Sequence, residues 1–204
     1  MKKFLAALLA GFCLTAAQPS YAEVEQYTFD KAHTQIFFSV NHLGFSNSTG
    51  KFLDFDGGFS FDRAEPAKSS VEVTINTAGI NMDDVKWDEH LKGADFFNVE
   101  KFPAMTFKST AVEVTGENTA NITGDLTLLG VTKPVVLAVT HNKSDKHAFS
   151  GKYVSGFSAT ATLKRSEFGM GYGLPMVGDD VSIRIEVEGE RVEPAASDAA
   201  SENK

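Results

Sequence analysis

The chain has 204 residues, of which 27 are acidic and 19 are basic, and its formal net charge is −8 at pH 7. This negative charge disfavours binding to nucleic acid and to anionic lipid surfaces, so a neutral or apolar ligand is expected. Cys13 is the only cysteine, which excludes a framework of intrachain disulfides. The length is sufficient for one domain with a sizeable hydrophobic core.

The N-terminus has the pattern of a secretory signal peptide. Two lysines precede an apolar run, residues 4–17, and the small residues Ser20 and Ala22 predict cleavage after Ala22. The run is shorter than the roughly 20 apolar residues of a transmembrane helix. A lipid anchor on Cys13 is the alternative, but Phe12 stands where lipoprotein signals usually have a small residue. We therefore expect an exported, periplasmic protein.

Three segments follow from this assignment: a signal peptide of residues 1–22, a ligand-binding domain of residues 23–192, and a disordered acidic tail of residues 193–204. Without the signal peptide, 17 basic residues stand against 27 acidic ones, a net charge of −10. Of the 17 phenylalanines, 15 remain. Phenylalanine supplies a large apolar area without a polar group, which suits a dry interior.

Apolar and polar residues alternate through most of the domain. Ile36, Phe38, Val40 and His42 share one face of the first clear strand. The same two-residue period recurs at 71–77, 105–114 with a slip in register after Ser109, 122–128, 135–141, 157–163 and 181–187.

Turn signals separate these strands. Turns are expected at residues 46–50 and 142–146, and a β-bulge is expected at Gly57 and Gly58. About eight to nine strands on short connections predict an all-β fold. We expect a single antiparallel up-and-down β-barrel of about eight strands, because closure removes the exposed strand edges.

One segment, residues 82–97, changes to a helical period. Trp87, His90, Leu91 and Ala94 fall on one helical face. A short helix inserted in a barrel is commonly a lid at its mouth. A second helical turn is expected at residues 165–168.

The sequence is compatible with two kinds of barrel interior. A barrel of about eight strands can be filled by side chains or can hold one small ligand. Small inward candidates, Gly124, Ala159 and Ala161, leave room between bulky ones and favour the ligand. Each buried methylene contributes about 0.8 kcal/mol, so an apolar chain could bind without a charged anchor.

The candidate ligand-binding residues are apolar, aromatic or histidine side chains on the inward strand faces, on the helix and on a glycine-rich rim loop. They are Phe38, Val40, His42, Phe52, Val73, Ile75, Trp87, His90, Leu91, Phe96, Phe97, Phe107, Ile122, Leu126, Phe157, Phe168, Met170 and Met176.

No metal site is predicted. The chain has five histidines, but no pair has the spacing of a helical zinc site and no cysteine remains in the domain. His42 and His90 are expected to be hydrogen-bonded within the core or at its rim, with contacts to a ligand head group as the alternative.

No catalytic residues are predicted either. The four carboxylates of Asp83, Asp84, Asp88 and Glu89 are typical of a solvated helix face. No serine lies in a nucleophile elbow, and the glycines of residues 169–173 lack the following Lys-Ser/Thr of a phosphate-binding loop.

Short motifs along the domain resemble a known family. They are DKAHT at 30–34, VNHLG at 40–44, GKF at 50–52, DEHL at 88–91, DFF at 95–97, KFP at 101–103, LTLLGVTKP at 126–134 and FGMG at 168–171. In this order they resemble the YceI-like proteins over about residues 27–192. The resemblance implies a lipocalin-like barrel, periplasmic or secreted, that binds polyisoprenoid or quinone-like lipids. Family members often have arginine where this chain has Trp87.

We therefore expect a non-catalytic carrier for one long apolar lipid, a polyisoprenoid or an isoprenoid quinone, with no required cofactor. No nucleic acid partner and no stable membrane span are expected, and a homodimer is possible. The alternative is a ligand-free β-barrel that serves as a stress-related protein-interaction module. An outer apolar patch would favour that alternative.

Overall fold

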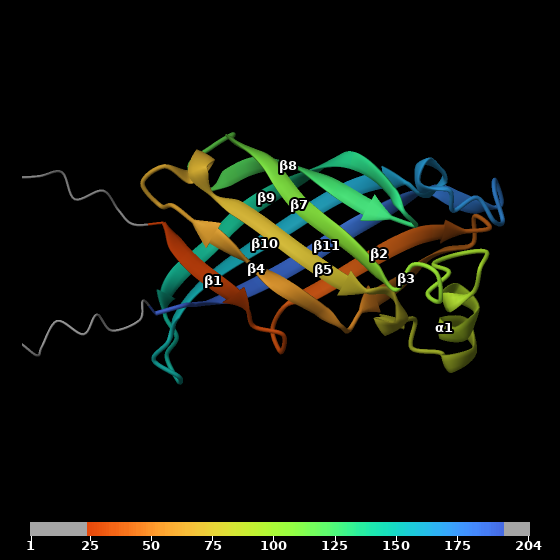
Figure 1. The fold of residues 1–204 in the computed structure, drawn as a ribbon, viewed down its shortest axis with the longest axis horizontal. Helices are drawn as coiled ribbons and strands as arrows, with labels where there is room; N and C mark the ends of the chain where they lie inside the picture. Colours follow the sequence, from red (N-terminus) through yellow and green to blue (C-terminus); the bar gives the residue numbers. More distant parts are fainter. Residues whose placement is uncertain (1–23, 194–204) are drawn as a thin grey trace, which may run out of the picture.

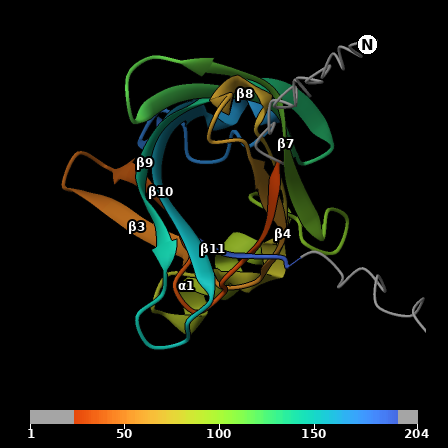
Figure 2. The ribbon, with the colours of Figure 1, turned by 90° about the vertical axis from the view of Figure 1, so that its left-hand side faces the viewer.

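A computed structural model describes residues 24–193, and these form a closed antiparallel β-barrel. In the order in which they pair around it, its strands are β1 (Glu25–Phe29), β4 (Phe55–Phe61), β5 (Ser70–Asn76), β7 (Ala104–Val114), β8 (Thr119–Leu128), β9 (Val131–Lys146), β10 (Tyr153–Lys164) and β11 (Val177–Arg191). The ring closes where β1 pairs with β11, and Figures 1 and 2 show it from the side and along its axis. The predicted fold class is confirmed.

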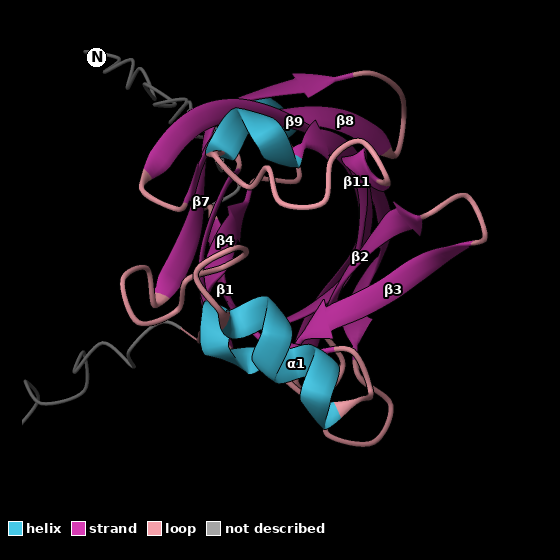
Figure 3. Ribbon diagram, turned by 90° about the vertical axis from the view of Figure 1, so that its right-hand side faces the viewer, coloured by secondary structure: helices cyan, strands magenta, loops and turns pink. Residues whose placement is uncertain are grey.

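Three further strands extend the barrel wall at one end. They are β2 (Gln35–His42), β3 (Ser46–Phe52) and β6 (Ile80–Asn81). β2 pairs with residues 177–186 of β11, β3 pairs with β2, and β6 pairs with β3. β11 therefore pairs along one edge with both β1 and β2. Figure 3 views this end of the barrel.

The helical elements are short. The α-helix, α1, spans Val85–Lys92, and the 3-10 helices are η1 (Pro66–Lys68), η2 (Thr77–Gly79) and η3 (Arg165–Phe168). The helix predicted over 82–97 is thus shorter than expected. Asp84 caps it by accepting a hydrogen bond from the Trp87 amide at 2.9 Å, and Gly93 ends it. The second helical turn lies at the predicted residues, as η3.

Two predicted turns are wrong. Residues 46–50 form most of β3, and the turn lies just before it, where Leu43 and Gly44 have φ values of 56° and 78°. Polar residues misled the prediction because β3 is a largely exposed strand. Residues 142–146 likewise continue β9. The expected slip in register after Ser109 is present.

The predicted bulge at Gly57 and Gly58 is also wrong, because the β4–β5 register runs through both positions without a shift and the β1–β4 register reaches Gly58 without one. A Cβ atom at Gly57 would overlap the carbonyl oxygen of Glu72, and one at Gly58 would overlap that of Tyr27. The two glycines allow neighbouring backbones to approach closely.

The predicted signal peptide and residues 194–204 of the predicted tail lie outside the described residues. Within residues 24–193, no helix is both long and apolar enough to cross a membrane.

Candidate functional site: an apolar tunnel

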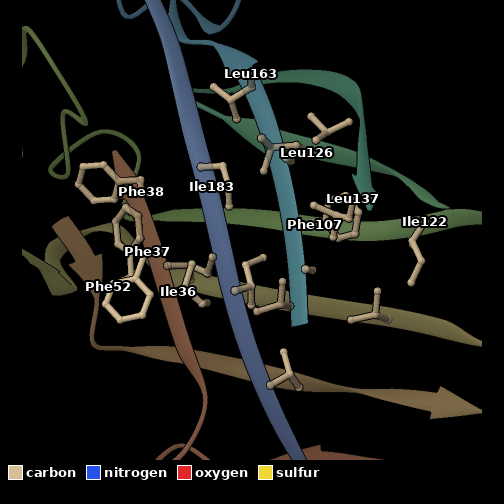
Figure 4. Close-up of a pocket in the computed structure, with 18 of the residues that line it drawn as sticks. Ile36, Phe37, Phe38, Phe52, Phe107, Ile122, Leu126, Leu137, Leu163 and Ile183 are labelled. Carbon is tan, nitrogen blue, oxygen red and sulfur yellow. The ribbon is translucent and has the colours of Figure 1, made fainter. Parts of the chain in front are cut away.

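A cavity of about 730 Å³ runs through the barrel. Strand alternation places apolar side chains on it, for example Val181, Ile183, Ile185 and Val187 of β11. Figure 4 shows Leu126, Leu137 and Ile183, from β8, β9 and β11, facing this space. The interior is therefore not filled by side chains.

The cavity reaches both ends of the barrel. Its lining includes Trp87 of α1 and Tyr172 of the loop after η3 at one end, and residues 116–119 of the β7–β8 turn at the other. On β11 it extends from Val177 to Val187, which corresponds to roughly 25 Å along the barrel axis for tilted strands. We call this cavity the tunnel, and its α1 end the mouth.

Glycines on the wall leave room for three phenylalanine rings. A Cβ atom at Gly50 would overlap the ring of Phe38, which is its direct partner across β2 and β3. In the same way, the ring of Phe107 occupies the space beside Gly124 on β8. The ring of Phe59 lies against Gly189 of β11. These rings lie over glycine backbone, which keeps bulky residues close to the wall.

Aromatic side chains from three elements meet at the mouth. The ring centroids of Phe96 and Tyr172 are 5.3 Å apart, and His90 lies 5.0 Å from Phe96 and 6.1 Å from Tyr172. His42 of β2 lies 6.2 Å from Trp87. The segment after α1 thus contacts the loop 169–176 through edge-to-face aromatic pairs.

The loop 169–176 is held by one buried cation. Arg165 donates hydrogen bonds to the carbonyl oxygens of Met170, Tyr172, Val177 and Gly178 at 2.8–3.0 Å. Burial lowers the pKa of this guanidinium. Because its donors are occupied by backbone, Arg165 fixes the shape of the mouth.

A polar network lies at the opposite end of the barrel. Glu25 accepts hydrogen bonds from Tyr27 at 2.7 Å, Arg191 at 2.8 Å and Arg63 at 3.1 Å. Burial would raise the pKa of Glu25, but the hydrogen bonds from Tyr27 and Arg191 outweigh it and lower that pKa. Both arginines also stack on the ring of Tyr153. The network joins β1 to β11 and to the segment after β4.

His141 of β9 forms part of the tunnel wall next to this network. Its imidazole contacts the rings of Phe61 and Phe157, and its Nε2 atom lies 2.8 Å from the Ser144 hydroxyl, which is bonded in turn to buried Ser155. Neither serine lines the tunnel. Burial lowers the pKa of His141, and the charge of Arg63 lowers it further.

Of the eighteen candidate residues, sixteen line the tunnel. They are Phe38, Val40, His42, Phe52, Val73, Ile75, Trp87, His90, Leu91, Phe96, Phe97, Phe107, Ile122, Leu126, Phe157 and Met170. Phe168 and Met176 do not: Phe168 of η3 is buried in the core beside the tunnel, and Met176 points into solvent. Neither lies on a strand, so the alternation of apolar residues with glycines in this segment did not fix the direction of their side chains.

The prediction missed several lining residues. Phe59, Phe61 and Leu163 follow the strand period and could have been included, whereas Tyr172 and Arg63 lie outside strands. Only the folded chain brings these last two to the tunnel.

The acidic residues around α1 have structural partners. Asp84 caps the helix, Asp88 accepts a hydrogen bond from the Met82 amide at 2.6 Å, and Glu89 pairs with Lys92 at 2.8 Å. These contacts fit a helix start and a solvated face.

One group of side chains has the composition of a metal site. Single ligand atoms of Asp30, His33 and Glu188 lie within 4.8 Å of one another. The sequence did not reveal this cluster because Glu188 lies on the last strand, far along the chain from Asp30 and His33. Asp30 and His33 already bond to each other at 2.7 Å, and none of the three lines the tunnel. The cluster braces the β1–β2 turn.

Together, the closed barrel and the apolar tunnel define a lipocalin-like architecture with an internal cavity. The sequence model of the YceI-like domain matches residues 27–189, and the chain belongs to the YceI-like family. A UPF0312 protein of Ectopseudomonas mendocina (strain ymp) is 44% identical over 193 residues, covering 94% of this chain and 99% of the relative.

Two solved structures share the fold. The YCEI protein of Campylobacter jejuni is 36% identical, with a TM-score of 0.68, covering 82% of this chain and 98% of that one. A polyisoprenoid binding domain from Saccharophagus degradans has a TM-score of 0.63 at 12% identity, covering 81% and 98% of the two chains. At that identity the likeness concerns the fold.

The lowered pKa of His141 predicts a pH dependence of stability. Its folded-state pKa lies below the ordinary value of a free histidine, so the unfolded chain binds the proton more readily. The free energy of unfolding should therefore fall as the pH drops below about 6.5. Urea unfolding between about pH 7.5 and pH 5.5 should show a smaller fall in His141→Gln than in wild type.

The matched control is His147→Gln, which removes an imidazole from the exposed β9–β10 turn. His33, whose pKa is raised by Asp30 and contributes the opposite sign, is present in all three proteins. An unchanged slope in His141→Gln would contradict the assignment.

Proposed function

We propose that the tunnel binds one long apolar lipid and that the protein carries this lipid without changing it chemically. The observation that supports the proposal is the tunnel itself, which is about 730 Å³ in volume and apolar from the mouth to the β7–β8 turn. Cavities of roughly 300–1,000 Å³ are typical of small-molecule sites. The elongated shape suits a chain-like ligand.

The energetics favour a hydrocarbon chain. One five-carbon isoprene unit buried in the tunnel contributes roughly 3–4 kcal/mol gross, at about 0.8 kcal/mol per methylene. Association costs an estimated 4–15 kcal/mol. A chain of about six or more units therefore exceeds even the upper cost without any ionic contact.

The mouth favours an uncharged head group. Its lining includes Trp87, His90, Phe96 and Tyr172 together with Arg165, which donates four hydrogen bonds to backbone carbonyls. A diphosphate would require free cations at this position. An isoprenoid quinone fits better, because its ring can stack on aromatic side chains. The description of the Saccharophagus degradans neighbour as a polyisoprenoid binding domain agrees with an isoprenoid ligand.

The serines and carboxylates with catalytic potential have structural partners, which supports a non-catalytic role. Ser144 and Ser155 bond to each other in the wall, and Ser166 donates to Asp179 at 2.8 Å. The carboxylates of Asp84 and Asp88 bond to backbone amides.

Blocking the tunnel tests the proposal. Ala161→Trp places a large ring inside the tunnel from β10, so co-purified lipid should be lost in native mass spectrometry. Thr160→Trp is the matched control, because the neighbouring residue is exposed on the outer face. We expect wild type and Thr160→Trp to retain one lipid and to bind added ubiquinone-8.

Wild-type protein free of lipid that also refuses ubiquinone-8 and octaprenol would contradict the proposed function. Equal occupancy in Ala161→Trp and Thr160→Trp would place the ligand outside the tunnel.

We also propose that the protein acts in the periplasm after removal of residues 1–22. The basic start and the small residues before Glu23 support export. The intact mass of protein recovered from the periplasmic fraction should correspond to a chain that begins at Glu23. A diacylated Cys13, or an uncleaved chain in the cytoplasm, would show that the assignment is wrong.

A further inference from the structure

Two loops at the mouth expose large apolar side chains to solvent. The β2–β3 turn, residues 43–45, exposes 45% of Leu43 and 89% of Phe45. The loop 169–176 exposes 52% of Tyr172 and 65% of Met176. We call these two segments the mouth loops. They lie side by side, because the Leu43 amide donates a hydrogen bond to the Met176 carbonyl oxygen at 3.1 Å.

The mouth loops lie in an uncharged part of the chain. Residues 43–50 and 169–178 contain no Asp, Glu, Lys, Arg or His, although 23% of the residues in the whole chain are Asp, Glu, Lys or Arg. Charged side chains are costly to bring into the apolar region of a membrane. The mouth loops therefore expose apolar side chains and contain no charged side chain that would oppose insertion.

The backbone keeps these side chains outside the barrel. Arg165 holds four carbonyl oxygens of residues 170–178, and Ser166 is bonded to Asp179, so the second mouth loop has a defined shape. Gly169 and Gly173 have φ values of 88° and 76°, which only glycine adopts readily. Met176 is thus presented to solvent by a fixed scaffold, to which the turn that carries Phe45 is joined by the hydrogen bond from the Leu43 amide.

The exposed surface is continuous with the tunnel. Met170, Tyr172 and Val177 line the tunnel, and Met176, which directly precedes Val177, is exposed to solvent. Figures 1 and 3 show both mouth loops and α1 at one end of the barrel. A lipid that leaves a bilayer at this point would meet apolar side chains along its whole way into the lumen.

We propose that the mouth loops dock on the surface of a zwitterionic lipid bilayer, with Phe45 and Met176 inserted among the lipids. The inference rests on the proposed function, because a carrier must exchange its lipid with a membrane. The net charge of −10 without the signal peptide and the acidic residues around α1 disfavour an anionic surface. Apolar insertion supplies the attraction instead of charge.

Sedimentation with sucrose-loaded phosphatidylcholine vesicles tests the proposal on the whole protein purified from the cell. Wild type should co-sediment, and Phe45→Ser/Met176→Ser should bind at least about tenfold more weakly, since each side chain contributes a buried apolar area. Phe149→Ser is the matched control. Phe149 is 96% exposed in the turn between β9 and β10, at the opposite end of the barrel, and its replacement should leave vesicle binding unchanged.

Three results would overturn the proposal: no binding of wild type to phosphatidylcholine, binding only when phosphatidylglycerol is added, or an equal loss in Phe149→Ser. Analytical ultracentrifugation adds a fourth, because self-association lost in the double variant without vesicle binding would assign the surface to a second copy of the chain.

Native mass spectrometry separates this inference from the proposed function. The double variant leaves the lumen intact and should still hold ubiquinone-8 delivered in detergent. Wild-type protein that binds vesicles but shows no bound lipid in native mass spectrometry would contradict the proposed function and the link between docking and lipid exchange. A wild type that holds lipid but ignores vesicles would overturn the docking surface alone.

Discussion

The open lumen depends on how phenylalanine rings pack against glycine backbone. Phe38 lies over Gly50, Phe107 beside Gly124, and Phe59 against Gly189. Any side chain at these glycines would push a ring towards the barrel axis. A barrel of about eight strands has little spare width, so a few displaced rings would be enough to divide the tunnel. The same residues that make the interior apolar thus remain at its edge, and the hydrocarbon chain we propose as ligand takes the space that they leave.

The two ends of the barrel differ in chemistry, and this difference determines which way the proposed ligand lies in the tunnel. At the end opposite the mouth, charge-assisted hydrogen bonds join Glu25 to Arg63 and Arg191. At the mouth, Arg165 uses its donors on backbone carbonyls and leaves an aromatic, uncharged rim. A ligand with an apolar tail and a neutral ring matches this polarity. The exposed apolar side chains lie at the end where the rim is aromatic, which is where a lipid would enter and leave.

The fold could be predicted from the sequence to a large extent, because a two-residue period over eight strands has few other solutions. The same period placed most of the tunnel residues, since inward direction follows from alternation. It failed where no period exists: Phe168 turns into the core, and Met176 turns into solvent. It also failed for β3, whose polar residues are those of an exposed strand. Contacts between distant positions, such as Arg191 with Glu25, could not be foreseen from local pattern.

The central claim is that the lumen is free of side chains because the rings lie on glycine. A crystal structure of delipidated protein under xenon pressure tests it most directly, since xenon enters apolar voids. The account predicts xenon sites in a row through the barrel, from the level of Leu163 to that of Phe157, with the rings of Phe38 and Phe107 against Gly50 and Gly124. Rings turned across the axis, with no xenon between them, would contradict it.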